Sequence, residues 1–187
     1  VVGGNSHQAV YNAMIISGSI PIFLTPEIEE DTGTELGVAP ETLIEAINLY
    51  PDCEVLILTL PNYYGIRYKY KEILSIARER KLKIIIDEAH GAHFNFIGED
   101  YPNGIALGAN AVVQSWHKTL PVLNQGSVLL SGKESKDYNF RESINLFQTT
   151  SPSYLIMSTI DSAADFLIGK KNDIIKVGQD ILEALRP

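Results

Sequence analysis

The sequence predicts an α/β fold, a three-layer α-β-α sandwich around a mostly parallel central sheet. Short apolar runs, such as residues 55–60 and 82–86, have the composition of strands that are buried on both faces. Amphipathic segments typical of helices, such as residues 40–50 and 70–81, alternate with these runs. Strands that alternate with helices form parallel sheets through right-handed crossovers, so we expect one layered domain.

The predicted strands are short and are separated by turn residues. The first residues, 1–4, also have the composition of a strand interior. Residues 27–37 are acidic and contain Gly and Thr, so we expect a surface loop there. The remaining predicted strands cover residues 20–24, 55–60, 83–87, 112–115 and 127–130.

Helix boundaries follow from residues that favour helix ends. Ser6 is a good N-cap for the first helix, and Pro40 suits the first position of the second. From Glu134 onward the chain is expected to be mostly helical. The predicted helices cover residues 7–17, 40–50, 70–81, 134–147, 153–168 and 173–185.

Length and composition exclude several classes of protein. The 187 residues, 45% of them hydrophobic, suffice for one domain with a substantial core. No apolar run reaches the roughly 18 residues of a membrane span, so we expect no membrane partner. Cys53 is the only cysteine and no signal peptide is visible, which fits a cytoplasmic location. The net charge of −8 argues against nucleic acid, because phosphates require a basic surface.

The two ends of the sequence suggest a piece of a larger protein. The chain begins Val1-Val2-Gly3-Gly4, without methionine and within a predicted strand. It ends Leu185-Arg186-Pro187, at the close of a predicted helix. We therefore expect residues 1–187 to be part of a domain rather than a complete protein.

Two segments carry most of the residues capable of chemistry. Asp87-Glu88-Ala89-His90-Gly91-Ala92-His93 follows one predicted strand, and Ser115-Trp116-His117-Lys118-Thr119 follows another. All the histidines of the chain are expected at strand ends or in loops, and Lys118 in a loop. Parallel strands end at the same edge of a sheet, which is where open α/β sheets bind ligands. We therefore expect Asp87 and Lys118 to converge there.

A carboxylate and a lysine on opposite sides of a small aromatic ring are the chemistry of pyridoxal phosphate. The lysine forms a Schiff base with this cofactor, and the acid partners its pyridinium nitrogen. A nearby negative charge keeps that nitrogen protonated and makes the ring a better electron sink. Each residue also has a plainer interpretation: Asp87 could cap the next helix, and Lys118 could be an ordinary exposed lysine.

The Asp-Glu-Ala-His segment is also found in the metal-and-nucleotide box of some helicases. That interpretation requires an upstream Gly-rich loop that ends in Gly-Lys-Ser or Gly-Lys-Thr. The only Gly-Lys pairs, at Gly132 and Gly169, continue with Glu134 and Lys171. The helicase interpretation is therefore disfavoured.

A metal site is a second alternative for the same segment. Asp87, His90 and His93 could converge on one face of a helix and bind a metal ion. This interpretation leaves Lys118 and His117 without a role. We therefore expect no metal.

Matching segments, in the same order across nearly the whole chain, make it resemble the major domain of the ornithine/lysine/arginine decarboxylases, and most of all their shorter bacterial branch. These are fold-type-I pyridoxal phosphate enzymes, so the resemblance implies an aspartate-aminotransferase-like large domain, here truncated. The matching segments are Asn5-Ser6-His7-Gln8-Ala9-Val10-Tyr11-Asn12, Leu60-Pro61-Asn62-Tyr63-Tyr64-Gly65, residues 87–94, Gln114-Ser115-Trp116-His117-Lys118-Thr119-Leu120, and Thr149-Thr150-Ser151-Pro152-Ser153-Tyr154.

The resemblance implies catalytic and cofactor-binding roles for individual residues. Lys118 would be the Schiff-base lysine, and Asp87 would pair with the pyridine nitrogen. His90 would sit beside the ring near its phenolic oxygen, and His7 would stack on the ring face.

Further residues follow from the same resemblance. Ser115 and His117 would touch the phosphate group, and Thr150-Ser151 would lie where the family reaches toward the neighbouring subunit's site. Asn62 and Trp116 depart from the family, in which a threonine and a small residue are more usual. The family's Gly/Ser/Thr-rich phosphate-binding turn and its C-terminal small domain are not among these 187 residues.

The resemblance implies a decarboxylase that acts on a basic amino acid. The parent protein would convert arginine, lysine or ornithine to the corresponding amine of the polyamine pathways and CO₂, as a homodimer or a higher homo-oligomer. Other fold-type-I reactions, such as aldol cleavage or transamination, use the same pair of acid and lysine. A third alternative is a catalytically silent fragment or interaction domain, and we expect the 187 residues alone to be inactive.

Overall fold

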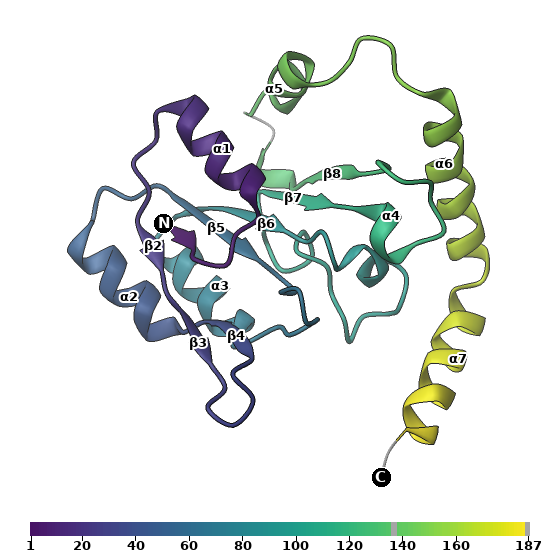
Figure 1. The fold of residues 1–187 in the computed structure, drawn as a ribbon, viewed down its shortest axis with the longest axis horizontal. Coiled ribbons are helices and arrows are strands. Elements are labelled where there is room, and N and C mark those ends of the chain that lie inside the picture. Colours follow the sequence, from purple (N-terminus) through teal and green to yellow (C-terminus); the bar gives the residue numbers. More distant parts are fainter. Residues whose placement is uncertain (136–137, 186–187) are drawn as a thin grey trace.

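The computed structural model of the chain describes residues 1–135 and 138–185, and its centre is a six-stranded sheet (Figure 1). The strand order is β2-β1-β5-β6-β7-β8. Neighbouring strands are parallel from β2 to β7, and β8 pairs antiparallel with β7. These strands are β1 (Val2–Gly3), β2 (Phe23–Leu24), β5 (Val55–Thr59), β6 (Lys83–Asp87), β7 (Ala111–Gln114) and β8 (Val128–Ser131). The predicted α/β fold with a mostly parallel sheet is confirmed.

The central strands align their carboxyl ends at one edge of the sheet. In β5 and β6, Leu56 lies opposite Ile84, and both are fully buried. At the ends of the strands, Thr59 lies opposite Asp87, and Asp87 lies opposite Val113 of β7. The segments that follow β5, β6 and β7 therefore start side by side, as the sequence predicts for parallel strands.

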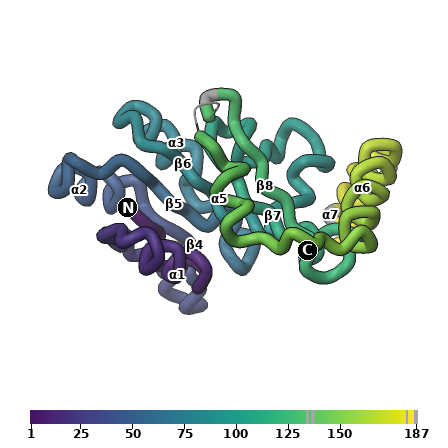
Figure 2. Tube along the Cα trace, turned by 90° about the horizontal axis from the view of Figure 1, so that it is seen from above, coloured from purple at the N-terminus to yellow at the C-terminus, as the bar shows by residue number. Residues whose placement is uncertain are grey.

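Helices cover both faces of the sheet. Helices α2 (Pro40–Leu49) and α3 (Tyr70–Glu79) lie on one face, and α1 (Gln8–Ser17) lies on the other (Figure 2). The main core lies between the sheet and the first two of these helices, since Leu43 and Leu74 pack there at full burial. On α1 only Met14 is buried.

Three further helices follow β8 in the part of the chain that the structure describes, and the last two lie at one end of the molecule, away from the first (Figure 1). They are α5 (Phe140–Phe147), α6 (Tyr154–Gly169) and α7 (Lys171–Ala184). A second, smaller core joins α6 to segments after β6 and β7, and Ala92, Phe96, Trp116 and Leu167 are buried in it. In the part of the chain that the structure describes, none of the helices combines the length and the apolar character needed to cross a membrane.

The prediction of a surface loop over residues 27–37 is wrong. This segment belongs to a two-stranded antiparallel hairpin of β3 (Pro26–Ile28) and β4 (Glu35–Val38). Most of its residues are exposed or half-buried, so the alternation that predicts strands is weak there. A side chain that lies outside the hairpin contacts it: the Nδ2 of Asn62 donates to the carbonyls of Glu35 and Leu36 at 2.7 and 3.1 Å.

Two predicted helix starts are also corrected. The N-cap of α1 is His7, whose Nδ1 accepts from the Ala9 N–H at 3.2 Å, whereas the Ser6 hydroxyl donates to the Gly3 carbonyl. The helix predicted over 134–147 is divided. It consists of a 3₁₀ turn, η2 (Lys133–Ser135), and α5, and residues 136–137 lie outside the described residues.

Candidate active site

Two short helices, which the sequence does not predict, carry much of the candidate site. They are η1 (Ala92–Asn95), after β6, and α4 (Trp116–Thr119), after β7. His93 therefore lies in η1, and His117 and Lys118 lie in α4, instead of in loops. The two segments are joined where they leave the sheet, because the Glu88 N–H donates to the Val113 carbonyl at 2.8 Å.

Lys118 and His90 are in contact at the carboxyl edge of the sheet. The Nζ of Lys118 lies 3.3 Å from the Nε2 of His90, within hydrogen-bond distance. The ring of Tyr63, which follows β5, packs edge-on against the imidazole of His90 with 5.5 Å between ring centroids. With Nε2 as the acceptor, a neutral His90 carries its hydrogen on Nδ1. Segments that follow three parallel strands thus meet at this point.

The pKa of His90 responds to the two charges that the sequence predicts to converge. Burial lowers the pKa of this imidazole, the nearby Lys118 ammonium lowers it further, and the Asp87 carboxylate raises it. Both charges therefore act on the same ring. A lowered pKa leaves His90 neutral at neutral pH, which allows its Nε2 to accept from Lys118.

Asp87 also makes a local hydrogen bond in the turn after β6. Its Oδ1 accepts from the Ala89 N–H at 3.1 Å, which stabilises the turn after β6. The carboxylate is half-buried at the strand end. Asp87 therefore stabilises a turn and does not cap the next helix, because the N-cap of η1 is Gly91 and has no side-chain hydrogen bond.

The other expected cofactor-binding residues follow β1 and β7. The Nδ1 of His7 is occupied by the α1 cap, and its side chain is exposed. Ser115 occupies the N-cap position of α4, with no side-chain hydrogen bond to that helix. The Nδ1 of His117 lies 2.9 Å from the carbonyl oxygen of Gly126. The side chains of His7 and His117 thus bond to backbone atoms of their own neighbourhoods.

The metal alternative has no support in the geometry. Within residues 1–135 and 138–185, no group of three or more His, Cys, Asp or Glu side chains is arranged to hold a metal ion. His93 instead packs against Phe94, with 4.4 Å between the ring centroids. Burial and the charge of Arg67 lower the pKa of His93.

A buried polar network, which the sequence does not predict, lies beside the site. Glu88 and Gln114 are both 0% exposed. The Oε1 of Glu88 accepts from the Gly104 N–H at 2.8 Å, and its Oε2 accepts from the Nε2 of Gln114 at 2.5 Å. The Oε1 of Gln114 in turn accepts from the Trp116 Nε1–H at 3.0 Å and from the Asn95 Nδ2 at 2.8 Å. The network therefore connects the ends of β6 and β7 to η1 and α4.

Burial raises the pKa of Glu88 to about 7. The hydrogen bonds from Gln114 and Gly104 and the charge of Arg67 act in the opposite direction but do not cancel it. The Arg67 guanidinium lies over the rings of Tyr70 and Phe94, at 4.1 and 4.6 Å from their centroids. Glu88 is thus a buried acid with a cation in its surroundings.

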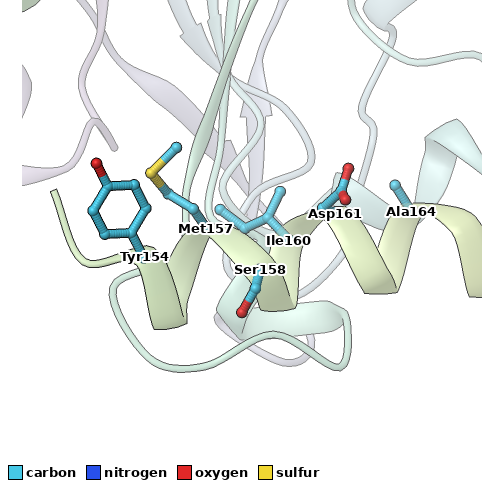
Figure 3. Close-up of a pocket in the computed structure, with 6 residues that line it drawn as sticks. All are labelled: Tyr154, Met157, Ser158, Ile160, Asp161 and Ala164. Atoms are coloured by element: carbon cyan, nitrogen blue, oxygen red, sulfur yellow. The ribbon is translucent and has the colours of Figure 1, made fainter.

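A separate open pocket of about 670 Å³ lies along α6 (Figure 3). It is lined by Tyr154, Met157, Ser158, Ile160, Asp161 and Ala164. All of these residues belong to one helix, so the pocket is a concave surface and not a cleft between elements. Neither Lys118 nor His90 lines it.

The sheet is that of an open α/β protein, and it brings an amine and an imidazole together at its carboxyl edge, which is where open α/β sheets bind ligands. Solved structures share this fold. The constitutive lysine decarboxylase of Escherichia coli matches with a TM-score of 0.74 and 21% identity, over 97% of this chain and 28% of that one. A PLP-bound putative aminotransferase from Clostridium difficile matches with a TM-score of 0.63 and 15% identity, over 98% and 47%. The fold is that of the fold-type-I pyridoxal phosphate enzymes.

The chain belongs to the Orn/Lys/Arg decarboxylase family, whose major-domain model matches residues 1–185. The uncharacterized protein YaaO of Bacillus subtilis is 38% identical over 170 residues, which cover 89% of this chain and 35% of that protein. An arginine decarboxylase of the same organism is 32% identical over 165 residues, or 87% and 34%. The chain spans about a third of the length of these relatives. Pyridoxal phosphate is the cofactor that membership of this family implies.

Proposed function

We propose that the whole protein to which this chain belongs decarboxylates arginine, lysine or ornithine to the corresponding amine and CO₂. Membership of the family supports this reaction, because its relatives include proteins named arginine decarboxylase. The single observation that carries the proposal is the contact of Lys118 with His90, on which the Asp87 charge also acts.

The residues at this edge fit pyridoxal phosphate by their chemistry. The aldehyde of the cofactor requires a primary amine, which Lys118 would supply, and the protonated ring nitrogen requires a carboxylate, which Asp87 would supply. His90 would lie beside the ring as a neutral imidazole. When bound, the cofactor supplies an electron sink for the pair of electrons that CO₂ leaves behind.

The proposed roles of the chain's own residues concern proton positions and binding. Asp87 would hold the proton on the ring nitrogen. His90 Nε2 would accept a proton from Lys118 Nζ, which leaves an uncharged amine. His90 would later give the proton back, so that Lys118 can deliver it to the Cα of the substrate. Ser115 and His117 would bind the phosphate group, and His7 would cover one face of the ring.

Spectroscopy of the whole protein tests the cofactor assignment. Addition of pyridoxal phosphate should produce the near-visible absorbance band of a lysine-bound cofactor. Reduction with borohydride followed by peptide mapping should then find the pyridoxyl group on Lys118. The band should be absent from Lys118→Ala, and a wild-type protein without the band would contradict the assignment.

Measurement of CO₂ release tests the reaction itself. The holoenzyme is supplied with arginine, lysine and ornithine in separate assays, and one of them should release CO₂. If the absorbance band is present but none of the three amino acids releases CO₂, the decarboxylase proposal is wrong. Aldol cleavage or transamination would then become the favoured reaction, because the same acid and lysine serve both.

We further propose a cytoplasmic homodimer or higher homo-oligomer that feeds polyamine synthesis. The exposed apolar side chains of Leu155, Phe166 and Val177 on α6 and α7 support association. Thr150-Ser151 would lie near the neighbouring subunit's site. Sedimentation of the whole protein tests the assembly, and a monomer would contradict it. The 187 residues alone should show no decarboxylase activity.

A further inference from the structure

Glu88 occupies a position between the two segments that carry the candidate site. It directly follows Asp87 in the chain, and its carboxylate contacts Gln114, the last residue of β7. Gln114 in turn contacts the indole of Trp116, the first residue of the helix that carries Lys118. A path of two side-chain hydrogen bonds therefore runs from the end of β6 to the start of α4.

The direction of every hydrogen bond in this path is fixed by the chemistry of its ends. The indole of Trp116 can only donate, so Gln114 must turn its Oε1 toward it. The Nε2 of Gln114 then faces Glu88, whose Oε2 must accept. The backbone N–H of Gly104 can also only donate, so the Oε1 of Glu88 accepts as well. Both oxygens of Glu88 thus face donors and serve as acceptors, and an amide at this position would turn an N–H group toward one of these donors.

Packing leaves Glu88 little freedom to move. A Cβ at Gly91 would lie 2.5 Å from the Cγ of Glu88, closer than real Cβ atoms approach other atoms. A Cβ at Gly104, whose N–H donates to Glu88, would lie 2.7 Å from a methyl group of Val112. The carboxylate is therefore enclosed by backbone on sides where a larger residue would not fit.

We propose that Glu88 is a positioning residue, which through Gln114 and Trp116 fixes Asp87 at the end of β6 relative to Lys118 on α4. This inference deepens the proposed function and rests on it, because the spacing of an acid and an amine matters for a cofactor between them. Preorganised groups of this kind depend on rigid supporting contacts, and small displacements weaken binding and catalysis.

Exchange of Glu and Gln between positions 88 and 114 tests the hydrogen bonds of the path while the side-chain volumes stay nearly the same. In Glu88→Gln the Nε2 of the new amide would face the Nε2 of Gln114, so two donors oppose each other. Gln114→Glu would place two carboxylates together. In the double variant Glu88→Gln/Gln114→Glu the carboxylate moves to position 114, where it can accept from Trp116, from Asn95 and from the new amide at position 88. Every hydrogen bond of the network can then form again except the long one, 3.4 Å, that position 114 donates to the Asn95 Oδ1. Exposed Glu79→Gln is the control.

The experiment uses the whole protein and two readouts. The first is the NMR titration of the His90 imidazole in the protein without cofactor, since its midpoint reports the charges of both Lys118 and Asp87. The second is the dissociation constant of pyridoxal phosphate from the absorbance band. We expect Glu88→Gln to displace the His90 midpoint and to weaken cofactor binding about tenfold, as for one unsatisfied buried donor. The double variant and Glu79→Gln should match the wild type in both readouts.

A purely structural role predicts a different result. If Glu88→Gln lowers the melting temperature but leaves the His90 midpoint unchanged, Glu88 does not position the site. A single variant that fails to fold leaves the decision to the double variant, which supports the inference if it restores the midpoint and overturns it if the midpoint stays displaced. Failure of the wild type to show the absorbance band would overturn the proposed function alone, because the His90 titration needs no cofactor.

Discussion

The Nζ of Lys118 lies 3.3 Å from the Nε2 of His90, although the two residues are 28 positions apart in the chain. The contact exists because β6 and β7 are adjacent and parallel, so the segments that follow them leave the sheet at the same edge. His90 is neutral in this arrangement, since burial and Lys118 both lower its pKa. An imidazole that is neutral beside a lysine can accept the proton that an amine must lose before it acts as a nucleophile.

The two charges near His90 should have opposite effects on its titration. Lys118→Met removes the cation that lowers the pKa of His90, so the pKa should rise. Asp87→Asn removes the anion that raises it, so the pKa should fall. NMR titration of the His90 imidazole in the whole protein without cofactor measures both changes. A His90 midpoint that is the same in both variants as in the wild type would show that the charges do not converge.

Asn62 should contribute strongly to stability, although the family more usually has a threonine there. Its Nδ2 donates to two carbonyls of β4, and its Oδ1 accepts from the Tyr64 and Ile66 N–H groups at 3.0 and 2.9 Å. The side chain is 3% exposed. Asn62→Ala leaves these backbone groups without partners, so we expect a loss of about 2–4 kcal/mol, at roughly 1 kcal/mol for each bond.

Urea unfolding of the whole protein measures the effect of Asn62→Ala. The matched control is Asn12→Ala on the exposed side of α1, which should change stability by less than about 0.5 kcal/mol. Asn62→Thr should be intermediate, because a hydroxyl can keep only part of the bonding. A midpoint for Asn62→Ala equal to that of the control would mean that the hairpin does not depend on this side chain.

The sequence predicts the sheet well because apolar runs such as residues 84–86 lie in strands with one buried and one half-buried face, and they leave a clear pattern. It does not predict the hairpin of β3 and β4, which is joined to the rest of the fold by hydrogen bonds from a side chain 26 and 27 positions away. The contact of His90 with Lys118 and the place of Asp87 at the same edge of the sheet follow from parallel topology and were predictable. The buried position of Glu88 was not predictable, since an acidic residue is ordinarily exposed.

The stability of the protein should carry a pH dependence that comes from Glu88. Burial raises the pKa of Glu88 from 4.5 to about 7 in the folded state. The folded protein therefore binds this proton more tightly than the unfolded chain does, so the contribution of Glu88 to stability is complete below pH 4.5 and is lost as the pH rises through 7. At about 1.4 kcal/mol for each pKa unit, the loss is about 3 kcal/mol.

Comparison of the wild type with Glu88→Gln isolates this effect. The amide does not titrate, so the difference in unfolding free energy between the two proteins should change with pH between 4.5 and 7 and be constant outside that window. Denaturation by urea at a series of pH values measures the difference. A difference that stays constant from pH 4 to pH 8 would show that Glu88 has an ordinary pKa.

Gly91 should tolerate no side chain, for reasons of space and not of backbone conformation. Its φ of −117° is available to any residue, but a Cβ would lie 2.5 Å from the Cγ of Glu88, 2.8 Å from Pro61 and 2.9 Å from Phe94. The Pro61 and Phe94 rings are rigid, so relief requires movement of the turn that carries His90. We expect Gly91→Ala to cost about 2–3 kcal/mol, whereas Gly169→Ala in α6, where a Cβ meets nothing within 4 Å, should gain up to about 1 kcal/mol. Thermal unfolding of the two variants measures the difference. If Gly91→Ala is as stable as Gly169→Ala, the turn after β6 can move without cost. Such a turn could not hold His90 against Lys118.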